Sequence, residues 1–434
     1  MHDVLDPRDL LADEWEQLNL SGYLVHELEP VVRKSVLAGD AAGMLCQLEA
    51  LSTAQRDPAW PYDEPSDPET VLGALNEIRA LPIRDEELPD RMRGAWLGRA
   101  VGNTLGKPVE GLTRLQVRTY LRAAGSWPLG GYLPLLEPLP PGVHHLHPSA
   151  PTATLGSFTD VPRDDDIDWT ILNLHVLERY GRDFTTDDVL REWLDRMPFT
   201  QTYTAERAAY RNAVSGMQPP ATATHRNPYR EWIGALIRAD AFGYVCPGDP
   251  GAAARLAFRD ARLSHVANGL YGELWAAALV AAAFASTSID AAMSAAHEVV
   301  PPGSRLTEVL RRISTLRRDG VDADTALDHI DAELGAYPWV HTLNNAAVIA
   351  VALLWGETFL DAVGIAVGAG RDTDSTAATV GSVHGALHGS GALPAHLLPN
   401  SPVRIRSAVR DFHRVAVDEL VERTLALTAR GVPA

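Results

Sequence analysis

The chain has 434 residues, of which 46% are hydrophobic and 22% are charged, an ordinary composition for a globular protein. With 38 Lys and Arg against 56 Asp and Glu, its formal net charge of −18 argues against a broad surface for nucleic acid or acidic membranes. The length allows about one to three domains around a large hydrophobic core.

Targeting and redox signals are few. The two cysteines, Cys46 and Cys246, are too sparse for a disulfide framework, which favours a reducing compartment. Residues 1–6 lack the basic and apolar regions of a signal peptide. The longest wholly apolar run, 274–285, is too short to cross a bilayer, so we expect a cytoplasmic protein that spans no membrane.

Residues 1–85 carry apolar positions at helical spacing, with a proline-rich break over 57–68. No motif in this region points to chemistry. We predict an N-terminal helical extension, packed on the rest or used as an oligomer contact, followed by a main domain over 86–434. The helices expected in the extension are 10–15, 24–37, 41–51 and 69–81.

A helix with glycine at every fourth position is expected over 91–110. Such a row lets a second helix approach its backbone closely. Pro108 ends the helix, and Glu110 follows on a loop, either as a functional acid or as a solvated one. The four glycines are Gly94, Gly98, Gly102 and Gly106.

The segment 127–162 is rich in proline and glycine and has no periodic pattern, which is typical of a functional or flexible loop. It contains His144, His145 and His147. These histidines lack the matching cysteine or carboxylate spacing that would predict a metal site of their own.

Four carboxylates within five positions precede the next apolar helical pattern. At a helix N-terminus they complement the macrodipole, but one or two acids are enough for that. Four adjacent acids repel one another unless a cation relieves the repulsion. They are Asp164, Asp165, Asp166 and Asp168.

The chain after these acids keeps helical spacing and shows almost no strand alternation, so the expected fold is all-α. The segment 227–234 is expected to open a helix, and the apolar run 274–285 to be a helix buried on all sides. His265 beside Asn268 is a candidate catalytic pair or, equally, a structural histidine with satisfied hydrogen bonds. The other helices expected are 186–194, 202–216, 252–262, 289–299, 305–318 and 325–334.

A second oxygen-rich cluster follows about 200 residues after the first. Asp372 and Asp374 cannot share a helix face, but a tight turn into a helix would direct both at one point, with Ser375 or Thr376 capping that helix. A ligand set of oxygen without cysteine or histidine suits Mg²⁺, Mn²⁺ or Ca²⁺ rather than zinc. We therefore predict that the two clusters form one metal site.

Together these motifs resemble the ADP-ribosylglycohydrolase family, which includes the glycohydrolase that reactivates dinitrogenase reductase. The resemblance runs from about residue 91 to residue 389. It rests on the glycine helix ending in Gly106-Lys107-Pro108-Val109-Glu110, the acidic cluster, and Gly370-Arg371-Asp372-Thr373-Asp374-Ser375. It implies a compact all-helical fold with two Mg²⁺ ions, or Mn²⁺ in their place.

The resemblance also implies the metal ligands. Asp164 stands where a Thr is usual, Ile167 replaces a second Thr, and Ser375 replaces a third. Oxygen ligation survives the first and third changes. The added charge of Asp164, with Asp168 nearby, is expected to alter metal preference or substrate fit. The implied ligands are Asp164, Asp165, Asp166, Asp372, Asp374 and Ser375.

Two divalent ions would hold both hydroxyls of a ribose cis-diol and polarise a bound water beside the anomeric carbon. The general base is expected among Asp165, Asp166 and Glu110, although Glu110 is also a candidate to gate the site or lie near one metal. The candidates for substrate binding are Ser264, His265, Asn268, Gly370 and Arg371.

The expected activity is hydrolysis of an N- or O-ribosyl bond in an ADP-ribosylated protein or small molecule. Two alternatives remain open: hydrolysis of a smaller, nucleoside-like ribosyl conjugate, and a catalytically silent relative that binds ADP-ribose or is structural. The carboxylates retained in both clusters argue against the silent relative, because a protein without catalytic activity has no need to keep acids that repel one another. The oligomeric state is left open.

Overall fold

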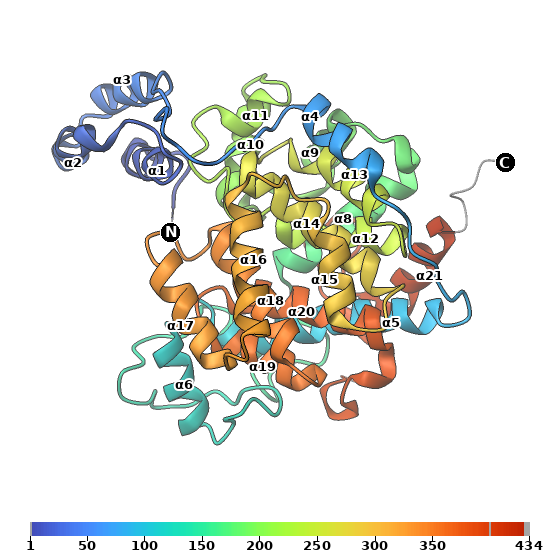
Figure 1. Cartoon of the computed structure of the whole chain (residues 1–434). Helices are drawn as coiled ribbons and strands as arrows, with labels where there is room; N and C mark the ends of the chain where they lie inside the picture. The colour runs from blue at the N-terminus through green and yellow to red at the C-terminus, as the bar shows by residue number, and fades with distance from the viewer. Residues whose placement is uncertain (1, 399–400, 429–434) are drawn as a thin grey trace.

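The computed structural model describes residues 2–398 and 401–428. Within these ranges the chain forms 21 α-helices and a single two-stranded sheet, which confirms the expected all-α fold (Figure 1). In the sheet, β1 (Arg404–Ile405) pairs antiparallel with β2 (Val415–Ala416). Over the same described residues, no helix is both long and apolar enough to cross a membrane.

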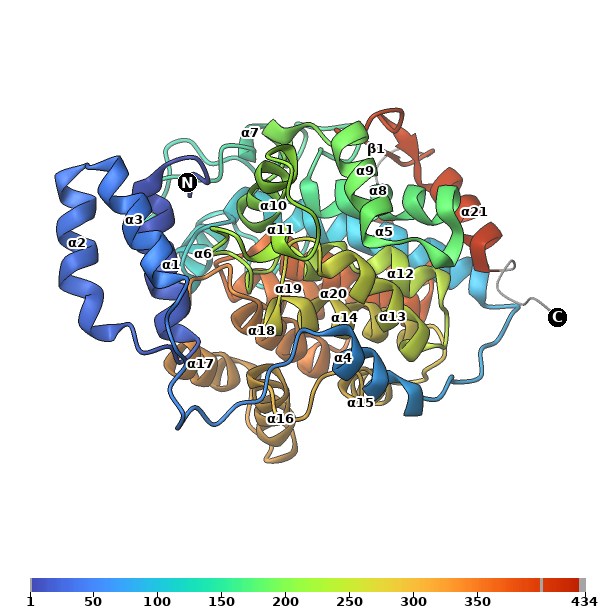
Figure 2. The same cartoon turned by 90° about the horizontal axis from the view of Figure 1, so that it is seen from above.

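The centre of the molecule consists of helices that are buried along most of their length. α14 (Ala267–Ala283) is buried at every position, as its run of Ala, Leu and Val residues predicts. Small side chains in its neighbours allow tight packing, and α14, α18 and α20 overlap at the centre of both views (Figure 2). The other central helices are α5 (Leu88–Gly106), α18 (Thr342–Trp355) and α20 (Thr373–His388).

The closest helix contact joins α5 to α20. A Cβ atom built on Gly98 would lie 2.0 Å from the carbonyl oxygen of Gly381, and one on Gly102 would lie 2.1 Å from that of Ala377. Only glycine permits this approach, because the atoms that block a side chain are backbone. The contact brings the C-terminus of α5 beside the N-terminus of α20.

Shorter helices surround this centre. Several begin with side-chain caps; Thr185, for example, exchanges hydrogen bonds with Asp188 at the start of α9 in a capping box. The surrounding helices are α6 (Arg114–Ala123), α7 (Ala150–Ala153), α8 (Asp165–Tyr180), α9 (Thr186–Arg196), α10 (Thr204–Val214), α11 (Ala221–Thr224), α12 (Asp240–Val245), α13 (Pro250–Ala261), α15 (Ile289–His297), α16 (Arg305–Arg318), α17 (Ala323–Leu334), α19 (Phe359–Gly368) and α21 (Val417–Thr428).

The prediction of a helix opening at 227–234 is wrong. This segment forms turns, and the first helical residues are those of the 3₁₀ turn η6 (Leu236–Arg238). The amide of Ile233 donates to the carbonyl of Val340 at 2.9 Å, and Trp232 forms a bridge with His341. These cross-chain hydrogen bonds replace the local bonds that a helix would need.

The N-terminal helices have an apolar cluster of their own and lie on one side of the molecule (Figures 1 and 2). They are α1 (Pro7–Leu20), α2 (Glu29–Ala38) and α3 (Ala41–Leu51). By contrast, α4 (Pro68–Ala74) contributes Val71 to the main core. The domain division at residue 85 therefore stays a prediction.

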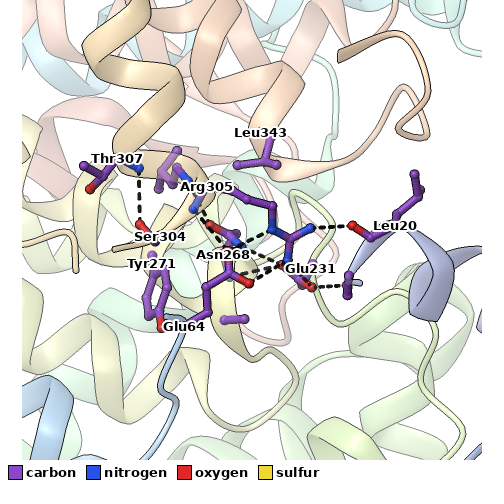
Figure 3. Close-up of polar contacts among 12 residues, drawn as sticks. Leu20, Glu64, Glu231, Asn268, Tyr271, Ser304, Arg305, Thr307 and Leu343 are labelled. Atoms are coloured by element: carbon purple, nitrogen blue, oxygen red, sulfur yellow. Dashed lines mark hydrogen bonds and ion pairs between the residues drawn. The ribbon is translucent and has the colours of Figure 1, made fainter. Parts of the chain in front are cut away.

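A buried ion network fastens α1 to the main body. Arg305 Nε donates to Glu64 Oε1 at 2.8 Å, and Arg305 Nη2 lies 2.7 Å from Glu231 Oε2 (Figure 3). Arg305 also donates to the carbonyl of Leu20, and Asn268 donates to both carboxylates. Burial opposes ionisation of Glu231, but Arg305, His341 and the hydrogen bonds from Asn268 and Ser21 together outweigh it and hold the pKa of that carboxyl well below its usual range.

Candidate metal centre

The two acidic clusters and Glu110 converge on one cavity. Asp164 is the N-cap of α8, and its Oδ1 accepts the amide of Asp166 at 3.0 Å. Asp372 is the N-cap residue of α20, but its side chain caps nothing and is free to face the cavity. Glu110 follows the 3₁₀ turn η3 (Lys107–Val109) at the end of α5. The α5–α20 contact is therefore what brings the two halves of the site together.

A strained turn aims the second cluster. Gly370 and Arg371 have φ values of +75° and +67°, in the left-handed region. A side chain at Gly370 would collide with the backbone of Arg114, its Cβ lying 2.6 Å from that nitrogen. The amide of Arg371 donates to the carbonyl of Leu112, and the amide of Gly111 donates back to Arg371. The turn is thereby held against the loop that carries Glu110.

Two groups of carboxylates are close enough to share an ion. In each group the ligand oxygens lie within 4.8 Å of one another. We call Glu110, Asp372 and Asp374 the 372 group, and Asp164, Asp166 and Asp374 the 164 group. Asp374 belongs to both groups, so its carboxylate would be available to an ion in either one.

Buried oxygens in these groups lack partners. Oδ1 of Asp166, Oδ2 of Asp372 and Oδ1 of Asp374 are buried and accept no hydrogen bond within residues 2–398 and 401–428. An unpaired carboxylate oxygen in the interior costs several kcal/mol, roughly, unless something compensates it. A hard divalent cation with oxygen ligands does so, and the residues present therefore fit Mg²⁺ or Mn²⁺.

The electrostatics of the protein atoms favour the same ligand. Burial raises the pKa of the Asp166, Asp372 and Glu110 carboxyls well above their usual range, and the charge of Asp374 raises each further. Burial also raises the pKa of Asp165 to about 6. A bound dication would remove the repulsion that keeps these acids from ionising together.

The structure brings together the seven residues predicted as catalytic or metal-binding. All of them line one cavity of about 420 Å³. Asp165 lines the cavity but belongs to neither carboxylate group. Ligation itself stays a prediction for each residue. The seven are Glu110, Asp164, Asp165, Asp166, Asp372, Asp374 and Ser375.

The predicted substrate-binding residues are placed elsewhere. Ser264 and His265 are fully buried, where the Ser264 hydroxyl accepts from Arg238 and meets Nδ1 of His265 at 2.8 Å. Asn268 is a member of the Arg305 network (Figure 3). Internal hydrogen bonds hold Ser264 and Asn268, whereas Nε2 of His265 has no partner within the described ranges. None of the three lines the cavity, so their role in substrate binding stays a prediction that these positions do not favour.

Gly370 and Arg371 lie beside the cavity rather than in it. Both line a small depression together with Asn344 and Trp339, and Trp339 also lines the large cavity. Arg371 forms an ion pair with Asp331 at 2.9 Å. A substrate large enough to extend past Trp339 would reach them.

The structure adds residues to the site that sequence reasoning missed. Lys107 contacts Oδ2 of Asp164, and His147 Nε2 lies 3.3 Å from Glu110 Oε2. The sequence did offer a clue to Lys107, because lysine is rare in this chain: only 2 of its 38 basic residues are lysines. The sequence offered no clue to the position of His147, because a segment without a periodic hydrophobic pattern does not indicate how it folds over the rest of the chain. Among the other cavity residues missed are His2, Arg163, Tyr203, Glu206, Arg207, Trp232 and Trp339.

Asp168 is turned away from the cavity. Its Oδ2 accepts from Nε of Arg163 at 2.7 Å, and its Oδ1 accepts from the hydroxyl of Ser407 and the amide of Ala408. The fourth acid of the cluster therefore fastens the start of α8 to the C-terminal region, which is a structural role.

Fold and site together define an all-α protein whose central helices converge on a carboxylate-lined cavity. A model of the ADP-ribosylglycohydrolase family matches residues 84–430. The chain belongs to this family, as the sequence motifs predicted. The family is one of glycohydrolases, and the match begins after the N-terminal extension and α4.

Comparisons with solved structures and with curated proteins give no further assignment. A solved structure described as an ADP-ribosylglycohydrolase-related protein complex is 22% identical in sequence, with 80% of this chain and 100% of that chain covered and a TM-score of 0.47. No curated protein matches the chain.

Proposed function

We propose that this chain is a divalent-metal-dependent glycohydrolase that cleaves an N- or O-ribosyl bond in an ADP-ribosylated protein or small molecule. The observation that carries the proposal is the set of buried, unpaired carboxylate oxygens on Asp166, Asp372 and Asp374 at the wall of the cavity. Family membership supplies the reaction class, and this arrangement supplies the reason for a metal.

The 372 and 164 groups would hold Mg²⁺, or Mn²⁺ in its place. When bound, such an ion supplies Lewis acidity toward the ribose hydroxyls and a water molecule. The chain itself fixes the geometry, since the α5–α20 contact sets the separation of Glu110 from Asp374. Positioning of this kind lowers the entropy that must be lost at the transition state.

Two side chains are placed to accept the proton of the attacking water. Asp165 lines the cavity outside both carboxylate groups, so its carboxylate stays available for proton transfer. Glu110 lies at the cavity edge with His147 beside it, which favours a role at the mouth of the site as well as in ligation. Nearby carboxylates also stabilise the positive charge that builds on the ribose as the leaving group departs.

Other residues of the cavity wall suit the remainder of an ADP-ribose. Tyr203, Trp232 and Trp339 present aromatic side chains to the cavity, and aromatic faces stack on nucleobases. Arg163 and Arg207 line the same space, and guanidinium groups bind phosphate oxygens in pairs. These residues support a nucleotide-bearing substrate.

The decisive experiment measures ADP-ribose release from an ADP-ribosylated protein in the presence of Mg²⁺. Asp372→Asn and Asp374→Asn should each lower turnover by at least about 100-fold, because each removes a charged ligand oxygen. The matched control is Asp290→Asn, which neutralises an exposed acid in the first turn of α15. Unchanged turnover in the two site variants would contradict the proposal.

A second candidate substrate is a smaller, nucleoside-like ribosyl conjugate. The 127–162 segment supplies His145, His147 and Pro148 to the cavity wall, and these side chains would shape the cavity for such a conjugate. A panel of ribosyl substrates separates the two candidates by their kcat/KM values. Binding of ADP-ribose without turnover of any panel member would instead identify a silent relative.

The cytoplasmic location stays a prediction.

A further inference from the structure

The two carboxylate groups are not equivalent, because a cation already lies in one of them. Lys107 contacts Oδ2 of Asp164 through its ammonium, and the Lys107 side chain is only 8% exposed. The other oxygen of Asp164 accepts the amide of Asp166. Both oxygens of this carboxylate therefore have partners within the protein.

Among the residues that the structure describes, no lysine or arginine forms an ion pair with a member of the 372 group. Oδ2 of Asp372 and Oδ1 of Asp374 are buried without a partner among the residues that the structure describes. His147 approaches this group, but it meets only Glu110, at 3.3 Å. Asp166 and the shared Asp374 also have one open oxygen each among the described residues, so the two groups differ at a single carboxylate. Asp164 is engaged at Oδ2 by Lys107 and at Oδ1 by an amide, whereas Asp372 keeps Oδ2 open.

An ammonium and a divalent ion cannot share the 164 group without strong repulsion. Lysine carries a compact point charge, unlike the delocalised charge of arginine. In the interior, where the effective dielectric constant is low, like charges at contact distance repel far more than they do in water. A dication in the 164 group would have to displace the Lys107 ammonium from Asp164.

Composition makes this lysine notable. The chain uses arginine at 36 of its 38 basic positions, and the only other lysine is Lys34, which is exposed on α2. In so arginine-rich a chain, the one lysine buried among carboxylates supplies a compact point charge where arginine would bring a delocalised one.

We propose that Lys107 is a built-in cation that takes the place of one divalent ion, so that this centre binds a single divalent ion in the 372 group. The two ions expected from the family resemblance would then be reduced to one ion and one ammonium. This inference rests on the proposed function only in requiring that the centre bind a divalent ion.

The test uses the full chain and Mn²⁺, with calorimetric titration for stoichiometry and electron paramagnetic resonance for ion–ion contact. The wild-type protein should bind one Mn²⁺ and give the spectrum of an isolated ion. Lys107→Met, which keeps the length of the side chain and removes its charge, should bind a second Mn²⁺ at least about tenfold more tightly than wild type does. Its spectrum should show two coupled ions.

The matched control is Lys34→Met, which removes the other lysine and should leave one isolated ion. Two Mn²⁺ ions of similar affinity in the wild-type protein would overturn this inference and leave the proposed function standing. Absence of any Mn²⁺ binding would overturn both, so the two failures are distinguishable.

A second pair of variants keeps the inference testable should Lys107→Met fail to fold. If Asp164 pairs with Lys107 and does not ligate the ion, Asp164→Asn should change the Mn²⁺ dissociation constant by less than about tenfold. Asp372→Asn should raise the same constant by about 100-fold or more. Equal losses in the two variants would show that Asp164 ligates the ion and would overturn the inference.

Discussion

His384 is a buried titratable group that lies apart from the proposed chemistry. It lies on α20, its Nδ1 has no hydrogen-bond partner within the described ranges, and its ring meets the edge of Phe359 at 5.8 Å. Burial and, to a lesser extent, the neighbouring His388 lower the pKa of His384 to about 4, against a weaker opposite effect of Asp361. The folded protein therefore holds this imidazole neutral.

The consequence is a loss of stability in acid. An unfolded histidine has a pKa of about 6.5, so between pH 6.5 and 4 the unfolded chain binds a proton that the folded one refuses. Stability from this group is present above pH 6.5 and is lost as the pH falls. Relative to His384→Phe, the wild-type free energy of unfolding should drop by about 2 kcal/mol between pH 8 and pH 5.

Urea denaturation at the two pH values measures this difference. Leu387→Ala, which removes packing from the same helix without removing a titratable group, is the control and should destabilise the protein equally at both. A gap between wild type and His384→Phe that does not change with pH would refute the assignment.

At the residue scale, the sequence predicted the composition of the site better than the role of each member. Asp164, Asp165, Asp166 and Asp168 look alike in sequence, but successive residues of a helix point about 100° apart. Asp164, Asp165 and Asp166 all line the cavity, where Asp164 meets Lys107 and Asp166 accepts from Asn103, whereas Asp168 reaches Ser407. The role of each acid depends on the helices that pack around α8, and the local sequence does not specify which helices those are.

At the scale of elements, the seam between α5 and α20 sets the geometry of the site. A Cβ on Gly102 would lie 2.1 Å from the carbonyl oxygen and 2.8 Å from the carbonyl carbon of Ala377. Backbone atoms in the middle of a helix cannot move aside singly, so a methyl group must push the two helices apart. That movement would separate Glu110 from Asp372 and Asp374.

Gly102→Ala should consequently lose about 1–3 kcal/mol of stability and weaken Mn²⁺ binding as well. Thermal denaturation and Mn²⁺ titration measure the two effects. Gly73→Ala is the control, because a Cβ at this exposed position in α4 meets nothing within 4 Å. It should leave Mn²⁺ affinity unchanged and gain up to about 1 kcal/mol from helix propensity. Equal behaviour of the two variants would argue against the seam as the element that sets the site.

The helices themselves were largely predictable, and their pairing was not. The glycine row of α5 indicated that some helix approaches it, but the partner lies more than 260 residues later in the chain. Periodicity reports the apolar face of each helix and says nothing about which face it meets. The turns at 227–234 were mistaken for a helix because Ile233 donates to Val340 and Glu231 accepts from Thr342, and local spacing cannot reveal these distant partners.

At the scale of the whole molecule, the N-terminal extension reaches the cavity. Val4 is fully buried against Tyr229 and Trp232, and the His2 ring stands edge-on to Trp232 at 4.8 Å. Asp13 of α1 holds His2 through a 2.7 Å contact with Nδ1. Sequence reasoning assigned no chemistry to this region because none of its residues forms a motif. Its contribution arises only from where α1 docks.

We therefore expect the extension to affect substrate binding and not metal binding. His2→Ala removes one aromatic ring from the cavity wall, and an aromatic pair is worth about 0.5–1.5 kcal/mol. The KM for an ADP-ribosyl substrate should rise by about two- to tenfold while the Mn²⁺ dissociation constant stays the same. His26→Ala is the matched control, since His26 is an exposed histidine of the same extension that does not line the cavity. Equal KM values for wild type and His2→Ala would show that the extension serves stability alone, whereas a change in Mn²⁺ affinity would place its influence on the carboxylate groups.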